Sequence, residues 1–269
     1  MTGSTRTIGV VNGGGDCPGL NALIRAVVRK AELEHSWRVI GVANGFNGLS
    51  WPEQSKELTL ESVGGILSRG GTILDTTNRG NPFAFPAQEK GRTVIRDYSG
   101  QCIEGMKKFG IEALIVIGGD GTLSIAHDFV KIGIKVVGIP KTSDNNLLAT
   151  ETTFGFETAL HVATDAIDRL QATADSHHRG MVIEVMGRDS GWIALHSGLA
   201  GGANVILIRE IPFTIGTVCE SIKSREEQGY PFPLVVVAEG ANLPLRDARG
   251  KLFPKTQPGQ MGNAIGFAI

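Results

Sequence analysis

The sequence predicts an α/β protein of two lobes, each a mainly parallel sheet flanked by helices. Apolar, β-branched runs recur along the chain, each ends abruptly in glycines or polar residues, and segments of helical periodicity separate them. The runs are TIGVVNGGGD, ALIVIGGDGT, KVVGIPKTSDNN, GMVIEVMGRDSG and LVVVAEGA. Runs such as 114–117 and 234–237 are typical of strands buried on both faces of a parallel sheet, because covering helices leave neither face wet.

Helical periodicity defines the segments between these runs. They are 20–34, 124–131 and 156–174. The β–α–β alternation predicts right-handed crossovers. A polar loop passes into the long third helix near residue 155, so we expect the lobes to comprise 1–155 and 156–269.

Composition and net charge indicate which classes of protein the sequence does not fit. The net charge of −1 argues against a wide nucleic-acid-binding surface. The three cysteines, at 17, 102 and 219, are odd in number and far apart, which favours a reduced cytoplasm over a disulfide framework. No apolar run approaches the ~20 residues that span a bilayer. We expect a cytoplasmic protein with neither a nucleic-acid nor a membrane partner.

Polar residues follow the strand-like runs at the edge where an open α/β sheet binds its ligand. These residues, which should converge on one crevice, are Asp16, Asp120, Asp144, Arg188 and Glu239. The loop 13–19 lies between a strand and a helix, so its free N–H groups can face an anion. It matches neither the Walker A nor the GxGxxG spacing. The alternatives are a phosphate cradle and a tight strand-to-helix turn.

Two further loops carry carboxylates. Asp120 lies among glycines in GGDGT, a natural place for Mg²⁺ that bridges phosphate oxygens, although it could instead cap the following helix. Lys141, Thr142 and Asp144 lie within four residues of one another in PKTSDNN. That set suits a general base beside a phosphoryl acceptor, and the alternative is an Asx-rich surface turn. Arg188, in MGRDSG, offers a fork that suits phosphate or carboxylate.

The motifs together resemble the phosphofructokinases, which phosphorylate fructose 6-phosphate. GGGDCPGLNALIR, GGDGT, PKTSDNN, EVMGRDSG and VVVAEG occur in the order and approximate spacing of that family. The resemblance implies two α/β lobes, nucleotide-binding and sugar-phosphate-binding in that order, with the active site between them. It also implies a homo-oligomer, usually a tetramer, that acts in glycolysis.

The resemblance implies roles for residues of the phosphoryl-donor site. The backbone of Gly15 would contact the transferred phosphoryl group, and Asp120 would hold Mg²⁺ on the donor phosphates. Gly121 and Thr122 belong to the same donor site, and Arg79, in TTNRGNP, would also reach the phosphates.

It likewise implies roles at the acceptor. Asp144 would be the base that takes the proton of the sugar's 1-hydroxyl, while Thr142 and Arg188 position the base and the moving phosphoryl group. Lys141 would belong to the same catalytic set. The sugar-phosphate contacts would be Met186, Gly187 and Glu239, with Arg179 lent to the 6-phosphate by a neighbouring subunit.

Two positions bear on the phosphoryl donor. Gly121 favours ATP, because a side chain there would crowd the α-phosphate of a nucleotide. Lys141 favours pyrophosphate, since pyrophosphate enzymes of the family carry lysine at this place. Some ATP enzymes combine the two residues, so we expect ATP, with pyrophosphate as the alternative.

Three departures from the family pattern leave a third hypothesis open. Asn146 replaces an acid, and an amide cannot supply its negative charge near a metal. Asp75 replaces a glycine beside the donor phosphates, which its carboxylate would repel. The sequence ends at 266–269, within a predicted helix and before the family's His- and Arg-bearing motif for the 6-phosphate. The hypothesis is a catalytically impaired homologue that binds nucleotide or sugar phosphate.

Overall fold

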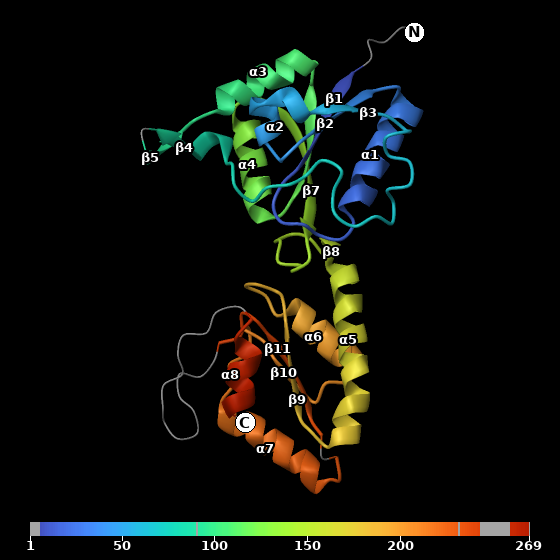
Figure 1. Ribbon diagram of the computed structural model, residues 1–269, viewed down its shortest axis with the longest axis vertical. Helices are drawn as coiled ribbons and strands as arrows, with labels where there is room; N and C mark the ends of the chain where they lie inside the picture. Colours follow the sequence, from blue (N-terminus) through green and yellow to red (C-terminus); the bar gives the residue numbers. More distant parts are fainter. Residues whose placement is uncertain (1–5, 90, 231, 243–258, 269) are drawn as a thin grey trace. The chain divides into compact units, whose positions relative to one another are not determined.

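The computed structural model describes residues 6–89, 91–230, 232–242 and 259–268. The chain divides into two compact units, Met1–Thr142 and Ser143–Ile269 (Figure 1). Each unit contains a mainly parallel sheet with helices on it, as the sequence predicts. The lobe boundary expected after residue 155 stays a prediction.

The first unit is built on a sheet whose central strand is wholly buried. Its strands lie in the order β3-β2-β1-β6-β7. Their bounds are β1 (Thr7–Asn12), β2 (Arg38–Val42), β3 (Lys56–Leu58), β6 (Ala113–Gly118) and β7 (Lys135–Thr142). All the pairings except β2 with β3 are parallel. The carboxyl ends of β1, β6 and β7 therefore lie at one edge.

Helices cover both faces of this sheet. They are α1 (Leu20–His35), α2 (Asn47–Ser50), α3 (Ser99–Phe109) and α4 (Asp120–Lys131), with the short 3₁₀ turns η1 (Pro52–Gln54) and η2 (Pro82–Ala84). Val10 packs with Leu20 and Ile24 of α1, whereas Val11 packs in a second cluster with Phe129 of α4. Consecutive strand residues face opposite sides, so α1 covers one face and the other helices the second.

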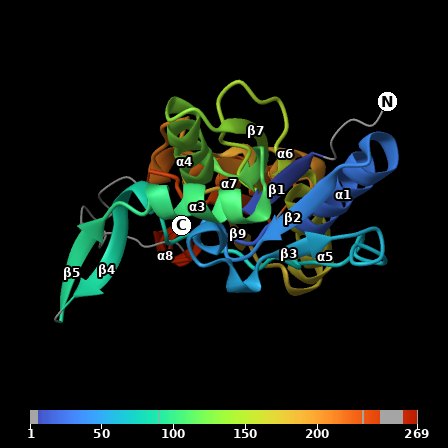
Figure 2. The ribbon, with the colours of Figure 1, turned by 90° about the horizontal axis from the view of Figure 1, so that it is seen from above.

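A β-hairpin extends away from the rest of the first unit. It consists of β4 (Phe85–Glu89) and β5 (Arg92–Arg96), which pair antiparallel and protrude to one side (Figure 2). The ring of Phe85, at its base, lies 5.3 Å from those of Trp51 and Tyr98. The aromatic contacts fix the hairpin to the body of the unit.

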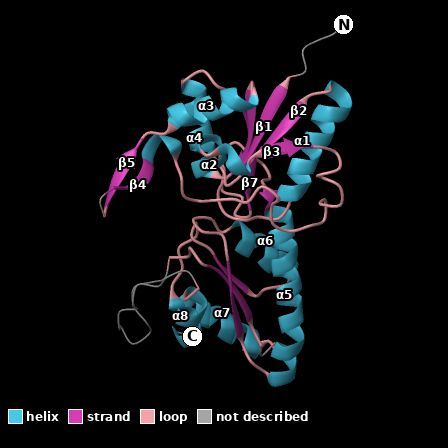
Figure 3. Cartoon of the chain, turned by 45° about the horizontal axis from the view of Figure 1, so that its top comes forward, coloured by secondary structure: helices cyan, strands magenta, loops and turns pink. Residues whose placement is uncertain are grey.

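The second unit is a smaller parallel sheet in the order β10-β11-β9, with helices on both faces (Figure 3). Its elements are β8 (Phe154–Gly155), α5 (Phe156–His177), β9 (Met181–Val185), α6 (Trp192–Ala200), β10 (Val205–Leu207), α7 (Ile215–Glu227), β11 (Leu234–Ala238) and α8 (Met261–Ala268). Val236 of β11 packs toward α5 and α6, and Val237 toward α7 and α8. Successive side chains of β11 therefore contribute to two hydrophobic cores, one on each face of the sheet.

The predicted elements are present at close to the predicted bounds. The runs 114–117 and 234–237 lie in β6 and β11, and all of their residues are buried except Ile115, which is partly exposed. The three predicted helices are α1, α4 and α5, and α4 begins at Asp120, earlier than expected. Among the described residues, no helix combines the length and the apolar character that a bilayer crossing requires.

Candidate functional site

The glycine loop after β1 is held by long-range hydrogen bonds within the first unit. Gly13 N–H donates to Ile117 O (2.9 Å) and Gly14 N–H to Thr77 O (3.0 Å). Thr76 Oγ1 donates to Gly14 O at 2.6 Å. Lys141 is 3% exposed, and its ammonium donates to Gly15 O at 2.7 Å. Its positive charge therefore lies at the loop that the sequence predicts to bind phosphate.

The glycines of this region fall into two groups. Gly13 is required by packing, because a Cβ there would lie 2.7 Å from Thr122 Cγ2, and a Cβ on Gly118 would collide with the same side chain. Gly15 and Gly121 are different, because a Cβ on either would meet nothing within 4 Å, and neither has a positive φ. No contact among the described residues explains these two glycines, whereas the close approach of a ligand to the backbone would.

Asp120 lies exposed in the first turn of α4. The helix begins at Asp120 itself and its N-cap is Gly119, so Asp120 is not the capping residue. No group of three or more His, Cys, Asp or Glu side chains that could hold a metal occurs among the residues that the structure describes. A single carboxylate still fits Mg²⁺ that is held mainly by phosphate oxygens and water.

The loop that carries Arg79 lies against the glycine loop. Gly14 N–H donates to Thr77 O, and Thr77 Oγ1 donates to Arg79 O at 2.9 Å. The Arg79 residue is exposed. Asp75, in the same loop, has a φ of 53°. This left-handed conformation gives a physical reason for glycine at the position, because glycine alone adopts it without a Cβ clash.

Replacing Asp75 with glycine is expected to stabilise the first unit by about 0.5 kcal/mol, because the left-handed residue loses its Cβ. The Asp75→Asn variant, which keeps the Cβ and loses the charge, is the control. Urea unfolding measures the difference, and a destabilised Asp75→Gly variant would contradict the backbone explanation.

In the second unit, Asp144 lies in an irregular segment before β8. Ser143 Oγ donates to Asp144 Oδ1 at 3.2 Å. The next residue, Asn145, is left-handed with a φ of 50°. Its amide donates to Glu151 O (3.2 Å) and accepts the Thr153 N–H (2.9 Å). The segment is thus a loop closed on itself by the Asn145 side chain.

The loop after β9 is organised around one carboxylate. Glu239, directly after β11, accepts through Oε1 the N–H groups of Gly187 (3.2 Å) and Arg188 (2.7 Å). Arg188 has a φ of 52°, and a side chain on Gly240 would collide with Arg188 O. The structure thus brings Glu239, Gly187 and Arg188 together. The Arg188 side chain is 77% exposed, and its Nε lies 3.9 Å from Asp189 Oδ2.

Further residues that sequence reasoning missed complete this loop. Gly191 N–H donates to Glu210 Oε1 at 2.9 Å, and Arg209 pairs with Asp189 at 2.6 Å. Ser190 Oγ donates to Asp144 O at 2.7 Å. No pattern in a single sequence links these pairs, because the two residues of each pair lie in different segments of the chain.

Arg179 does not join the other predicted acceptor residues within one chain. It follows α5 and precedes β9, whereas Met186, Gly187 and Arg188 follow the carboxyl end of β9. The five residues of β9 span about 16 Å. Arg179 and Met186 are both exposed.

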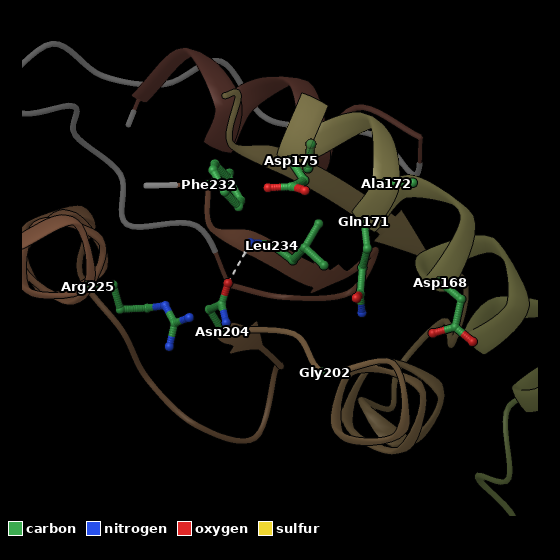
Figure 4. Close-up of a pocket in the computed structure, with 10 residues that line it drawn as sticks. Asp168, Gln171, Ala172, Asp175, Gly202, Asn204, Arg225, Phe232 and Leu234 are labelled. Carbon is green, nitrogen blue, oxygen red and sulfur yellow. Dashed lines mark hydrogen bonds between the residues drawn. The ribbon is translucent and has the colours of Figure 1, made fainter. Parts of the chain in front are cut away.

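The second unit contains a cavity of about 590 Å³ (Figure 4). It lies at the amino ends of the strands, whereas the Arg188 loop follows the carboxyl end of β9. Its lining includes Asn204 and Leu234, which stand at the amino ends of β10 and β11. Asn204 Oδ1 accepts the Leu234 N–H at 2.8 Å, and the Gln171 amide donates to Gly201 O. Ligands of open α/β sheets bind at the carboxyl ends, so we do not assign the catalytic site to this cavity.

The described residues define an α/β protein whose strand-end loops present backbone N–H groups, a buried ammonium and single carboxylates. A family model described as Phosphofructokinase matches residues 7–264. The chain therefore belongs to the phosphofructokinase family.

Similar proteins include both donor types. ATP-dependent 6-phosphofructokinase 2 of Clostridium perfringens is 54% identical over 237 residues, which are 88% of this chain and 64% of that protein. Pyrophosphate–fructose 6-phosphate 1-phosphotransferase of Amycolatopsis methanolica is 53% identical over 235 residues, 87% of this chain and 65% of that protein. The chain thus spans about two thirds of the length of these relatives.

A solved structure also resembles this fold. The T-state phosphofructokinase of Pichia pastoris matches with a TM-score of 0.81 and 30% identity, over 99% of this chain and 28% of that one. The likeness agrees with the α/β fold described above.

Proposed function

We propose that this protein transfers a phosphoryl group from ATP to the 1-hydroxyl of fructose 6-phosphate and forms fructose 1,6-bisphosphate. The observation that carries the proposal is the pairing of the Arg188 loop with the segment of Asp144 through Ser190. Asp144, the proposed base, and Arg188, the proposed phosphoryl-binding cation, would then act from two connected loops of one unit. The names of the similar proteins supply the reaction class and the sugar phosphate.

On the donor side, the backbone at Gly15, the Lys141 ammonium and Arg79 would face the negative phosphoryl groups. Lys141 already lies 2.7 Å from Gly15 O, so its charge offsets the repulsion between the loop carbonyl and an incoming anion. Asp120 would hold Mg²⁺, which when bound neutralises charge on the donor phosphates. Gly121, beside Thr122, leaves room for the α-phosphate of a nucleotide.

On the acceptor side, Asp144 would accept the proton of the 1-hydroxyl as that oxygen attacks. Thr142 precedes the base by two residues and would position it. Arg188 would stabilise the negative charge of the moving phosphoryl group. Met186, Gly187 and Glu239 would contact the sugar, and Glu239 also fixes the loop through its bonds to backbone N–H groups.

A homo-oligomer belongs to this proposal. Arg179 follows α5 at the amino end of β9, whereas Arg188 lies beyond its carboxyl end. Arg179 can serve a 6-phosphate bound near Glu239 only from another copy of the chain. A cytoplasmic location is proposed with this function, because the three cysteines are odd in number and far apart in the sequence, which favours a reducing compartment over a disulfide framework.

The test is the formation of fructose 1,6-bisphosphate from fructose 6-phosphate and Mg²⁺, with ATP or pyrophosphate supplied in parallel. Product with ATP that disappears on chelation of Mg²⁺ would support the proposal. Product with pyrophosphate alone would show that the donor assignment is wrong and the acceptor assignment right. The absence of product with both donors would contradict the proposal for this chain.

Pyrophosphate is the second candidate donor, and Lys141 is the observation that favours it. Its buried ammonium at the glycine loop could replace contacts that a nucleotide would make. A pyrophosphate enzyme also occurs among the similar proteins at nearly the same identity as the ATP enzyme.

The impaired-homologue hypothesis makes Asn146 decisive. Asn146 is exposed in the loop that follows Asp144, and the family pattern has an acid at this position, whose negative charge the amide cannot supply. Asn146→Asp is expected to raise kcat about tenfold and to lower the Mg²⁺ concentration required for half-maximal rate. Asn146→Ala, which adds no charge, is the control. An Asn146→Asp rate no higher than that of the control would contradict the charge explanation.

A further inference from the structure

A buried hydroxyl joins the segment of Asp144 to the loop of Arg188. Ser190 is 6% exposed, and its Oγ lies 2.7 Å from Asp144 O and 3.1 Å from Gly187 O. The Gly187 carbonyl already accepts the Ser190 N–H at 2.9 Å. The shorter of the two hydroxyl distances is the one to the Asp144 carbonyl, so that bond is the stronger tie of the Ser190 side chain.

Ser190 lies in a turn that is held by hydrogen bonds on both sides of the residue. On one side of Ser190, the N–H groups of Gly187 and Arg188 donate to Glu239. On the other side, Gly191 N–H donates to Glu210 and α6 begins directly afterwards. The position of Ser190 is thus set by two carboxylates. They are Glu239, which follows β11, and Glu210, which follows β10.

The bond acts on the backbone of the proposed base, not on its carboxylate. Asn145 ties the segment to residues 151–153, and Ser143 contacts the Asp144 carboxylate. Ser190 differs from both, because it ties the main chain at Asp144 to the turn between β9 and α6. A shift of that turn would therefore move Asp144 and Arg188 together.

We propose that Ser190 is a positioning residue that holds the base Asp144 in register with Arg188. The proposal rests on the proposed function, which makes Asp144 the proton acceptor and Arg188 the cation for the moving phosphoryl group. Neither the base nor the cation is removed when the hydroxyl is lost. The loss should therefore affect the rate of the chemical step more than the binding of either substrate.

The kinetic test compares Ser190→Ala with Ser197→Ala in the full chain. Ser197 is a matched control, because it is buried in the same unit and its Oγ donates to Ile193 O within α6 at 2.6 Å. We expect kcat to fall about tenfold in Ser190→Ala, since a misplacement of ~1 Å can cost about a hundredfold. KM for both substrates should change less than about twofold, and Ser197→Ala should keep kcat within about twofold.

Ser190→Cys provides a second variant of nearly the same size. Its weaker S–H donor should give a kcat between those of the unsubstituted chain and Ser190→Ala. A kcat in Ser190→Ala equal to that in Ser197→Ala would overturn the proposal, as would a rise in KM with an unchanged kcat.

Amide hydrogen exchange tests the link without activity. In Ser190→Ala the amides of residues 144–153 should exchange about tenfold faster than in Ser197→Ala, because the segment loses its tie to the β9–α6 turn. If the unsubstituted chain forms no product with either donor, the proposed function fails, and the exchange measurement still decides whether Ser190 holds the segment. Equal exchange in the two variants would overturn the proposal.

Discussion

Asp144→Ala is expected to lower kcat for fructose 1,6-bisphosphate formation by about a thousandfold. A positioned general base contributes roughly 10²- to 10⁴-fold to such a reaction, because it removes the hydroxyl proton as the oxygen attacks. KM for both substrates should change little, since a carboxylate that accepts a proton in the transition state contributes little to ground-state binding. Steady-state kinetics with each substrate varied in turn measures both quantities.

The control for Asp144→Ala is Asp165→Ala in the same unit. Asp165 pairs with Arg169 on the exposed surface of α5, and exposed pairs of this kind contribute about 0–1 kcal/mol. Its kcat should stay within about twofold. A kcat for Asp144→Ala within tenfold of the unsubstituted chain would contradict the assignment of the base.

Gly121→Asp is expected to separate the two phosphoryl donors. The ATP-supported rate should fall about a hundredfold, because a carboxylate close to the α-phosphate adds both bulk and roughly 1–4 kcal/mol of repulsion at ~4 Å. Pyrophosphate has no α-phosphate of a nucleotide, so any pyrophosphate-supported rate should change less than about threefold. The ratio of kcat/KM for the two donors, measured in each variant, is the readout.

Measurements of the free energy of unfolding separate the effect of Gly121→Asp on donor binding from any effect on folding. A Cβ at Gly121 would meet no atom of the described residues within 4 Å, so the free energy of unfolding should change by less than about 1 kcal/mol. Gly13→Ala is the contrasting variant, because its Cβ would lie 2.7 Å from Thr122 Cγ2. That variant should be destabilised by about 1–3 kcal/mol. Equal losses of ATP-supported and pyrophosphate-supported rate in Gly121→Asp would contradict the donor argument.

The sheet strands could be predicted because their signal is local. Every residue of the runs 114–117 and 234–237 is apolar, because helices cover both faces of each strand. Short strands such as β3 and β10 carry three residues each and gave no such pattern. The hairpin of β4 and β5 was missed as well, because its residues are mostly exposed.

The candidate site could be predicted only as a set of loops. Residues at strand ends were found because parallel strands end at a common edge. Their partners were not found, since each bond joins distant segments: Thr76 to Gly14 across 62 residues, Lys141 to Gly15 across 126, and Ser190 to Asp144 across 46.

The amino-acid order alone determines where this chain forms strands and helices and which chemical groups end its strands, because hydrophobic periodicity and glycine placement act over a few residues. The tertiary structure decides which of those groups are fixed by packing or hydrogen bonds, and which residues are their partners. Packing against Thr122 requires glycine at Gly13 and leaves Gly15 unconstrained. Glu239 and Glu210 fix the Arg188 loop through bonds that exist only once β9, β10 and β11 lie side by side.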